Sequence, residues 1–208
     1  LEHLGISDLY AVIGASYGGM VALAMGERYP YLAKRLIVIS AAHRTHPMAT
    51  AWRSVQRNIV RYALTHAEGA EGLRIARALA MSTYRSASEF EQRFTGEPER
   101  TAQGFRFPVE SYLFARGDAY AATYIPESFV CLSESIDLHR VNPAAITVPV
   151  TLVAIREDQL VPLSDMQTLH SQLAGPSELI ELSSKFGHDA FLKETDALMA
   201  VFAKALSH

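Results

Sequence analysis

A strand-like segment that breaks on glycine and resumes as a helix is the feature that most constrains the fold of this chain. Residues 9–13, LYAVI, form a continuous apolar run, and GASYG at residues 14–18 separates this run from a helical pattern at residues 19–29. An unbroken apolar run of this length is typical of a strand that is covered on both faces, as in a parallel sheet. The segment therefore predicts a parallel sheet whose strands are joined by helices.

Three further segments have the same character, which extends the predicted sheet. They are RLIVIS at residues 35–40, VTLVAI at residues 150–155 and ELIEL at residues 178–182. A helical pattern with apolar residues three and four apart follows the last of them, at residues 190–206. Strands that alternate with helices indicate the α/β class, with a doubly wound parallel sheet.

A long interruption, residues 43–142, divides the predicted sheet. It is rich in helix formers and has no strand-like run of comparable strength, so we expect an inserted helical lid on a core formed by residues 1–42 and 143–208. The interruption holds 12 of the 19 basic residues, all of them arginine, against 11 acidic residues. These arginines either form a salt-bridged surface or, in a few cases, bind a carboxylate or the phosphates of a nucleotide-like molecule.

The composition limits the classes of function. With 208 residues, 49% of them hydrophobic, the chain can bury one sizeable core. Its net charge of −3 does not indicate binding to nucleic acid, and it has no basic amphipathic stretch of the kind that binds a membrane surface. The single cysteine, Cys131, excludes an internal disulfide and a CxxC metal site, and it is compatible with the cytoplasm. We therefore expect a small-molecule substrate, no metal and no permanently bound cofactor.

The first residues suggest that more sequence precedes them in the intact protein. The chain begins with Leu1, and LEHLGISD reads as the last turn of a helix, closed by Gly5, that leads directly into the first strand. We therefore expect an upstream segment of the same protein.

Ser16 lies at the centre of the glycine-rich turn, in the pattern GxSxG. Gly14 and Gly18 stand two residues before and after it, where we expect side chains to collide in a tight bend. Tyr17 would open the following helix, so its backbone N–H is a candidate oxyanion donor at the positive helix end. The alternative is a glycine-rich turn whose serine has no chemical role.

A serine becomes a nucleophile only when a base takes its proton and a third group orients that base. The acid is expected just beyond the next-to-last strand, where REDQLVP contains Glu157 and Asp158, and the DxLxP frame favours Asp158. The base is expected after the last strand, where SSKFGHDAFL contains His188. The order Ser16, Asp158, His188 matches a known chain order for such triads. For Glu157 we prefer a surface or helix-terminal charge.

The chain contains the four motifs LEHLGI, GASYGGM, ARALAMSTYRSASEFEQRF and GHDAFL. Together they resemble the homoserine O-acyltransferase family of α/β-hydrolase enzymes, and the resemblance covers essentially the whole chain. The resemblance implies Ser16 as nucleophile, His188 as general base and acid, and Asp158 as the orienting carboxylate. It also implies that an amino acid substrate is held by Arg77, Tyr84 and Asp189. The family commonly has Met where this chain has Tyr17, a difference that bears on the acyl pocket.

The resemblance further implies an activity. The reaction would be ping-pong transfer of an acetyl or succinyl group from acyl-CoA, a co-substrate, to the hydroxyl of L-homoserine, in the methionine biosynthesis of the cytoplasm. The resemblance also implies a homodimer, further strands of the sheet before the serine turn, and a second oxyanion donor from a loop in that upstream region. Alternatives are a serine O-acyltransferase, a carboxylesterase or thioesterase with the same triad, and an inactive binding module. Arg77, Tyr84 and Asp189 distinguish the acyltransferase, because a simple esterase does not need them.

Overall fold

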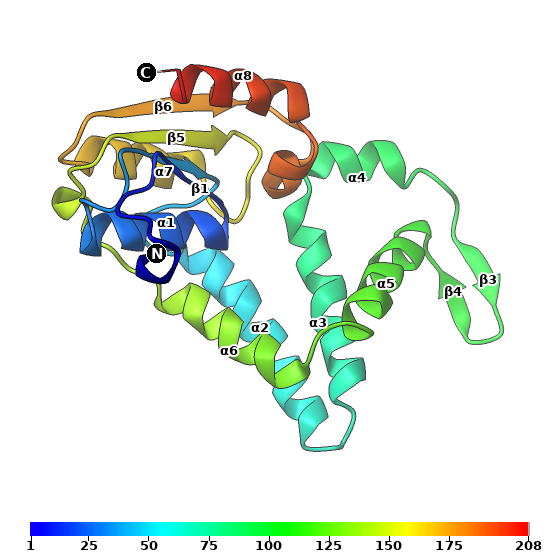
Figure 1. Ribbon diagram of the computed structural model, residues 1–208. Helices are drawn as coiled ribbons and strands as arrows, with labels where there is room; N and C mark the ends of the chain where they lie inside the picture. The colour runs from blue at the N-terminus through cyan, green and yellow to red at the C-terminus, as the bar shows by residue number, and fades with distance from the viewer. Residues whose placement is uncertain (208) are drawn as a thin grey trace.

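The computed structural model describes residues 1–207, which form a twisted sheet with helices on both faces and a helical lid (Figure 1). The sheet has four parallel strands in the order β1-β2-β5-β6. These strands are β1 (Val12–Ala15), β2 (Leu36–Ile39), β5 (Val150–Ile155) and β6 (Ser177–Leu182). All four lie within or overlap the apolar segments that predicted them, so the predicted parallel sheet is confirmed.

Helices cover the two faces of the sheet and create two buried layers. On one face, α1 (Tyr17–Arg28) and α7 (Leu163–Gln172) pack with buried strand residues such as Val38 and Leu152. On the other face, α8 (Thr195–Ala205) packs on Ile37, Ile39 and Val153. The predicted last helix begins later than its pattern indicated, because residues Gly187–Leu192 form a 3₁₀ segment, η3.

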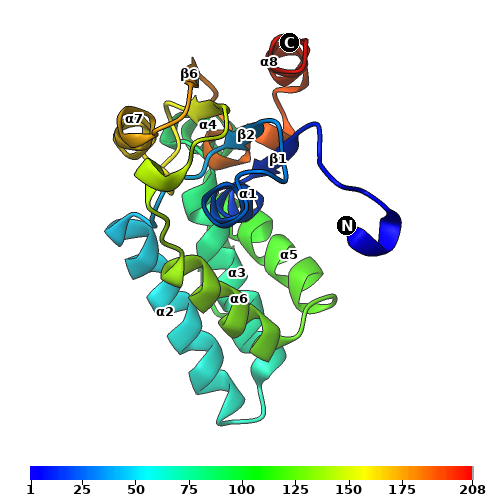
Figure 2. The same ribbon diagram turned by 60° about the vertical axis from the view of Figure 1, so that its left-hand side comes forward.

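The interruption at residues 43–142 consists mainly of helices. They are α2 (Pro47–Leu64), α3 (Gly69–Tyr84), α4 (Ala87–Arg93), α5 (Pro108–Ala121) and α6 (Pro126–Leu138). Figure 2 shows α2, α3, α5 and α6 gathered on the side of α1 that faces away from α8. A short antiparallel hairpin, β3 (Glu99–Thr101) and β4 (Gly104–Arg106), was not predicted. Its residues are mostly exposed and polar, so it has no apolar run for a sequence pattern to detect.

A buried ionic cluster ties the lid helices α2 and α6 together. Arg53 donates from Nε to Oδ1 of Asp137 at 2.8 Å, Arg57 also binds this carboxylate, and Thr50 donates to it at 2.9 Å. Burial acts to raise the pKa of Asp137, but the hydrogen bonds from Arg53 and Arg57 outweigh it, and the net pKa is lowered. The lid is therefore held together by charged side chains from distant parts of the chain as well as by apolar packing.

Two segments connect the lid to the core, and they pair with each other. Arg44 and Arg140 face each other in an isolated antiparallel bridge, and the backbone N–H of Val141 donates to the carbonyl of His43 at 3.0 Å. None of the helices in the described part of the chain combines the length and apolar character needed to cross a membrane.

Candidate active site

Ser16 occupies the sharp turn between β1 and α1 in a conformation that few non-glycine residues adopt. Its backbone angles are φ 52° and ψ −120°, and its N–H donates to the carbonyl of Ile39 at 2.8 Å. A Cβ at Gly14 would lie 2.1 Å from the carbonyl oxygen of Gly18, so only glycine fits at position 14. Strained backbone of this kind persists only where the surrounding structure enforces it, and it is concentrated at functional sites.

The predicted collision at Gly18 is wrong. A Cβ at Gly18 would meet no atom within 4 Å, because α1 directs this position toward solvent. The constrained position is Gly19, where a Cβ would lie 2.7 Å from the Cβ of Ala41. The second close approach in the turn is thus between the first turn of α1 and the end of β2, one residue later than predicted.

The structure brings Ser16, His188 and Asp158 together in the geometry of a catalytic triad. His188 Nε2 lies 2.7 Å from Ser16 Oγ, and His188 Nδ1 lies 2.7 Å from Asp158 Oδ2. The other carboxylate oxygen of Asp158 accepts from the backbone N–H groups of Leu160 at 2.8 Å and Val161 at 3.0 Å. With its carboxylate buried and held on both sides, Asp158 can fix the imidazole in the tautomer that accepts a proton from serine.

Glu157 turns away from this site. Its carboxylate accepts hydrogen bonds from the hydroxyl of Ser183 and from the backbone N–H of Ser184 at 2.8 Å, which lie just after β6. Burial acts to raise the pKa of Glu157, but these hydrogen bonds outweigh it and lower the pKa. Glu157 therefore ties together the loops that carry Asp158 and His188.

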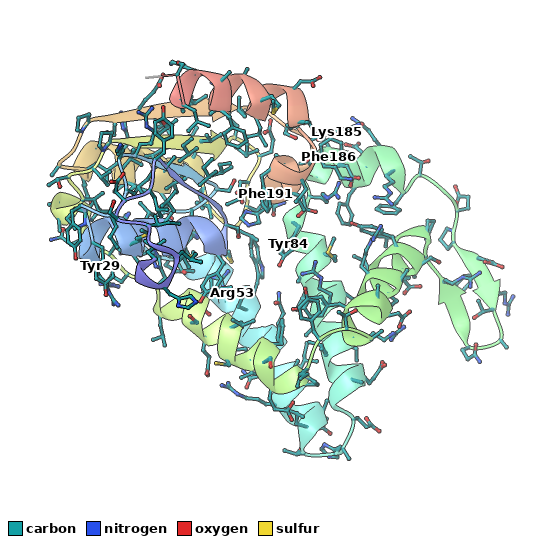
Figure 3. All side chains as sticks on the ribbon, in the orientation of Figure 1. Tyr29, Arg53, Tyr84, Lys185, Phe186 and Phe191 are labelled. Atoms are coloured by element: carbon teal, nitrogen blue, oxygen red, sulfur yellow. The ribbon has the colours of Figure 1, made fainter. Side chains whose placement is uncertain are left out.

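The loop that carries His188 is docked on the end of the lid helix α3 (Figure 3). The carbonyl of Lys185 accepts from Ser86 Oγ at 2.6 Å, and Arg85 Nε donates to Asp189 Oδ2 at 2.9 Å. Gly187 has φ +54°, and a Cβ there would lie 2.8 Å from the carbonyl oxygen of Tyr84. Only glycine permits both the left-handed backbone and this close contact, so the histidine loop and the lid are fitted to each other.

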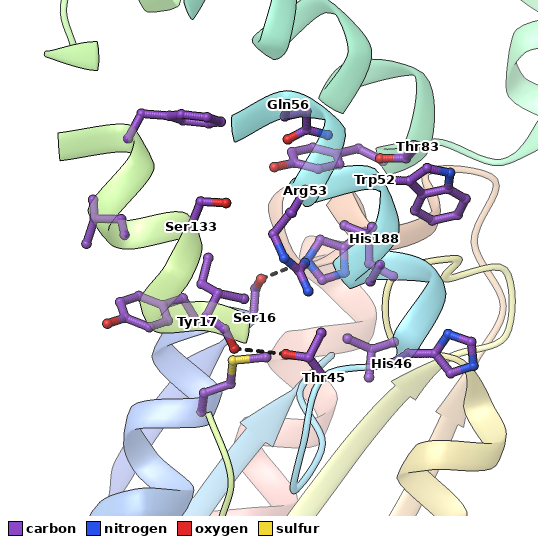
Figure 4. Close-up of a pocket in the computed structure, with 18 of the residues that line it drawn as sticks. Ser16, Tyr17, Thr45, His46, Trp52, Arg53, Gln56, Thr83, Ser133 and His188 are labelled. Atoms are coloured by element: carbon purple, nitrogen blue, oxygen red, sulfur yellow. Dashed lines mark hydrogen bonds between the residues drawn. The ribbon is translucent and has the colours of Figure 1, made fainter. Parts of the chain in front are cut away.

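Ser16 and His188 border a cavity of about 210 Å³ between the core and the lid (Figure 4). Arg77 and Tyr84 also line it, and Arg77 Nη1 donates to Tyr84 Oη at 3.4 Å. The guanidinium of Arg77 lies over the rings of Tyr84, at 5.1 Å, and Tyr120, at 4.8 Å. Within residues 1–207 it makes no ion pair. A partly buried cation without a carboxylate partner is suited to an anionic ligand.

Two of the predicted site residues do not line the cavity in the described chain: Asp158, which lies behind His188, and Asp189. The carboxylate of Asp189 is ion-paired with Arg85 instead. The reason is the tight docking of the histidine loop, which directs the residue after His188 toward the end of α3.

Several lining residues of the lid were not predicted, among them the polar residues Arg53, Gln56 and Tyr120. Gln56 is only 4% exposed and has no hydrogen bond within the described chain, so its amide is available to a ligand. Burial raises the pKa of Tyr120, and the charge of Arg77 opposes this. These three polar residues lie on α2 and α5, and only the packing of the helices determines which of their faces borders the cavity.

Tyr17 is the first residue of α1, so its backbone N–H is among the helical donors that have no partner within the helix. Its side chain reaches the lid, where Tyr17 Oη lies 2.9 Å from Ser135 Oγ. The described residues contain no group of three or more histidine, cysteine or acidic side chains placed to hold a metal ion.

Comparison with known proteins identifies the family and the fold of the chain. The model of a family described as alpha/beta hydrolase fold matches residues 1–195. The chain belongs to this family. It is 43% identical over 206 residues to a homoserine O-succinyltransferase of Xanthomonas campestris pv. campestris, covering 99% of this chain and 56% of that protein. It is 37% identical to an L-serine/homoserine O-acetyltransferase of Streptomyces lavendulae, covering all of this chain and 64% of that one. These relatives confirm the resemblance seen in the sequence.

Solved structures show the same fold. Esterase E22 superposes with a TM-score of 0.88 at 23% identity, covering all of this α/β-hydrolase chain and 63% of that chain. A homoserine O-acetyltransferase from Bacillus anthracis superposes with a TM-score of 0.87 at 17% identity, covering all of this chain and 62% of that one. The chain thus spans between about half and two thirds of the length of the proteins it matches.

Proposed function

We propose that this protein is an L-homoserine O-acyltransferase that passes an acyl group from acyl-CoA through Ser16 to the hydroxyl of homoserine. The observation that carries the proposal is that one cavity holds both the Ser16 and His188 pair, 2.7 Å apart, and the unpaired guanidinium of Arg77. Ser16 and His188 supply a nucleophile and its base, and Arg77 supplies a partner for the carboxylate of an amino acid. The names of the relatives support the same activity. We propose that it serves methionine biosynthesis.

The first half-reaction acylates Ser16. His188 Nε2 takes the proton of Ser16 Oγ as the oxygen attacks the thioester carbonyl, and Asp158 stabilises the resulting imidazolium. The backbone N–H of Tyr17 is one donor to the oxyanion. When the carbon–sulfur bond breaks, the thiol of CoA leaves with the proton from His188, and the acyl-serine remains.

The second half-reaction transfers the acyl group to the acceptor. The homoserine hydroxyl gives its proton to His188 Nε2 and attacks the acyl carbonyl, and Ser16 Oγ recovers the proton as its bond to the acyl carbon breaks. Arg77 and Tyr84 bind the carboxylate of the acceptor, for which a guanidinium and a hydroxyl are matched donors. A role for Asp189 in binding the ammonium group would require its release from Arg85. Transfer prevails over hydrolysis because the lid encloses the cavity and positions the hydroxyl.

For the donor, we favour succinyl-CoA over acetyl-CoA. The relative that is 43% identical is named as a succinyltransferase. A succinyl group has a terminal carboxylate, and Arg53 lines the same cavity as Ser16. Nε and Nη2 of Arg53 bind Asp137, whereas its Nη1 makes no hydrogen bond within the described residues and would be the donor to that carboxylate. An acetyl group has no charge that would use this arginine.

Intact-protein mass spectrometry tests the proposal. The protein is mixed briefly with succinyl-CoA or acetyl-CoA without an acceptor, and an acyl adduct is expected on Ser16 and absent from Ser16→Ala. Adding homoserine should remove the adduct and produce the O-acyl amino acid. Loss of the adduct to water at the same rate with and without homoserine would indicate an esterase instead. Absence of any adduct would indicate a binding module.

A further inference from the structure

The structure divides the 12 arginines of residues 43–142 into two sets. Seven form ion pairs with acidic side chains: Arg53, Arg57, Arg61, Arg74, Arg85, Arg93 and Arg106. The other five make no ion pair with any described residue: Arg44, Arg77, Arg100, Arg116 and Arg140. Most of these arginines therefore have the salt-bridging role that their number suggested, and the unpaired set carries charge that no carboxylate of the described residues neutralises.

A groove of about 300 Å³ adjoins the catalytic cavity and contains one of the unpaired arginines, Arg140. It follows α1 from Tyr17 to Arg28, and the end of α6 forms its other side. The groove and the catalytic cavity share Tyr17 and Met20 as lining residues, so the two are neighbours. Arg28 is exposed at the far end of α1, and within the described chain it makes no ion pair either.

Arg44 and Arg140 lie where the catalytic cavity and the groove meet. They are directly opposite each other in the antiparallel bridge between the core and the lid, and Arg44 lines the catalytic cavity while Arg140 lines the groove. Like charges directly opposite in an antiparallel pair are destabilising. Both side chains are exposed, and neither is neutralised by a carboxylate of the described residues. An anion between them would relieve this repulsion.

Arg28, Arg44 and Arg140 outnumber the described acidic residues around the groove and the neighbouring end of the cavity, which are Glu27 and Asp165. Glu27 is the one acidic residue among the described residues that line the groove, and its Oε1 accepts from the backbone N–H of Asn142 at 2.7 Å. Asp165 lines the catalytic cavity and acts to raise the pKa of His43. Burial lowers that pKa most, and Arg44 and Arg140 lower it further, so the net pKa is below its ordinary value.

We infer that Arg28, Arg44 and Arg140 bind the phosphate groups of the nucleotide part of the acyl donor. The inference rests on the proposed function, which requires a donor with a reactive acyl end and distant phosphates. The groove runs in the direction that such a donor requires. Its end at Tyr17 adjoins Ser16, and its other end holds Arg28, about 16 Å away along α1. Guanidinium groups bind phosphate oxygens through paired, charge-assisted hydrogen bonds. Tyr17, Met20, Val21 and Ala24 give the middle of the groove an apolar wall for the uncharged arm of the donor.

The test compares a donor that has phosphates with one that has none. Succinyl-CoA, or acetyl-CoA if that is the better donor, is compared with p-nitrophenyl acetate in Arg28→Gln, Arg44→Gln and Arg140→Gln. The ratio of kcat/KM for the CoA ester to that for the phosphate-free ester is expected to fall about tenfold for each variant. General damage to the cavity affects both donors and leaves the ratio unchanged. Arg100→Gln and Arg116→Gln are matched controls, because both arginines are unpaired lid residues that line neither the catalytic cavity nor the groove.

Direct binding separates this inference from the proposed function. Adenosine 3′,5′-bisphosphate, measured by calorimetry, is expected to bind the wild-type protein and to bind Arg140→Gln about tenfold more weakly. If this holds while homoserine is never acylated, the phosphate site stands and the proposed function fails. If homoserine is acylated but the donor ratio is that of the wild type in all three variants, the inference is overturned. Equal losses in the two control variants would also overturn it, because they would reveal only a general effect of positive charge.

Discussion

The core and the lid each shield an aspartate side chain from most of the solvent, but they hold it in different ways. Asp158 of the core is bound by two backbone N–H groups two and three residues ahead of it and by one histidine. Asp137 of the lid is bound by the side chains of Arg53 and Arg57, which are 84 and 80 residues away. The core thus positions its reactive groups by local backbone geometry, whereas the lid is assembled by long-range contacts between charged side chains. In the proposed function the first aspartate orients the base, whereas the second holds two lid helices together.

Asp158→Asn gives the largest expected effect. The asparagine can still accept from the backbone N–H groups of Leu160 and Val161, but its amide would face His188 Nδ1 and favour the wrong tautomer. We expect kcat to fall by about 10⁴-fold, which corresponds to about 5 kcal/mol of transition-state stabilisation, with little change in stability. Steady-state kinetics measures the loss. Glu157→Gln, at the neighbouring acid outside the triad, is the control, and a loss below about tenfold in Asp158→Asn would contradict the triad.

Asp137→Asn should lower the stability of the protein, which Asp158→Asn is expected to leave nearly unchanged. The change at Asp137 leaves Arg53 and Arg57 buried without their counter-charge, so the free energy of unfolding is expected to fall by about 3–5 kcal/mol. Urea denaturation measures this change. Asp118→Asn is the matched control, because this lid aspartate is bound to Arg74 but its side chain is 62% exposed, and its loss should cost less than about 1 kcal/mol. Equal losses in the two variants would remove the distinction drawn between buried and exposed ion pairs of the lid.

Arg77→Gln separates the two half-reactions. Losing a charged contact to the acceptor carboxylate should lower kcat/KM for homoserine by about 10- to 100-fold, while acylation of Ser16 proceeds at the wild-type rate. Rapid-quench measurement of each half-reaction provides the comparison. Arg74→Gln, one turn earlier on α3 and paired with Glu71 and Asp118, should leave both steps unchanged. A slower acylation step in Arg77→Gln would assign this arginine to the donor instead.

The smallest effect is expected at the junction of core and lid, as a pH dependence of stability. Burial is the largest cause that lowers the pKa values of His43 and His139 below the ordinary value of about 6.5. The unfolded chain then binds more protons than the folded one just below this pH, so stability should fall as pH decreases from about 7 to about 5. Urea denaturation across this range measures the slope, and a double variant with Gln at both positions should flatten it. An unchanged slope in that variant would assign the dependence to other groups.

The sequence was most informative where structure is local. Apolar runs predicted the four strands of the sheet, and short motifs next to strand ends predicted Ser16, Asp158 and His188, which the structure brings together. The same reasoning misplaced one detail, because the direction in which a helix leaves a turn decides whether Gly18 or Gly19 meets the sheet.

Features set by long-range packing were beyond the reach of sequence patterns. The pairing of Asp189 with Arg85 joins residues 104 apart, and nothing near either residue indicates it. Gln56 and Tyr120 became candidate site residues only when α2 and α5 were placed around the cavity. The unpaired arginines could be recognised only after the partners of the others were known.

Because the histidine loop is docked on α3, the position of His188 depends on the position of the lid. Gly187 is packed against the carbonyl of Tyr84, and Lys185 and Asp189 are bound to Ser86 and Arg85. Any outward movement of this end of α3 would draw His188 away from Ser16. With the lid moved outward, His188 could not act as a base at Ser16. In the proposed reaction, an acyl-serine exposed to solvent would then not be hydrolysed rapidly. In the proposed function, the triad is therefore complete only while the end of α3 rests on the histidine loop.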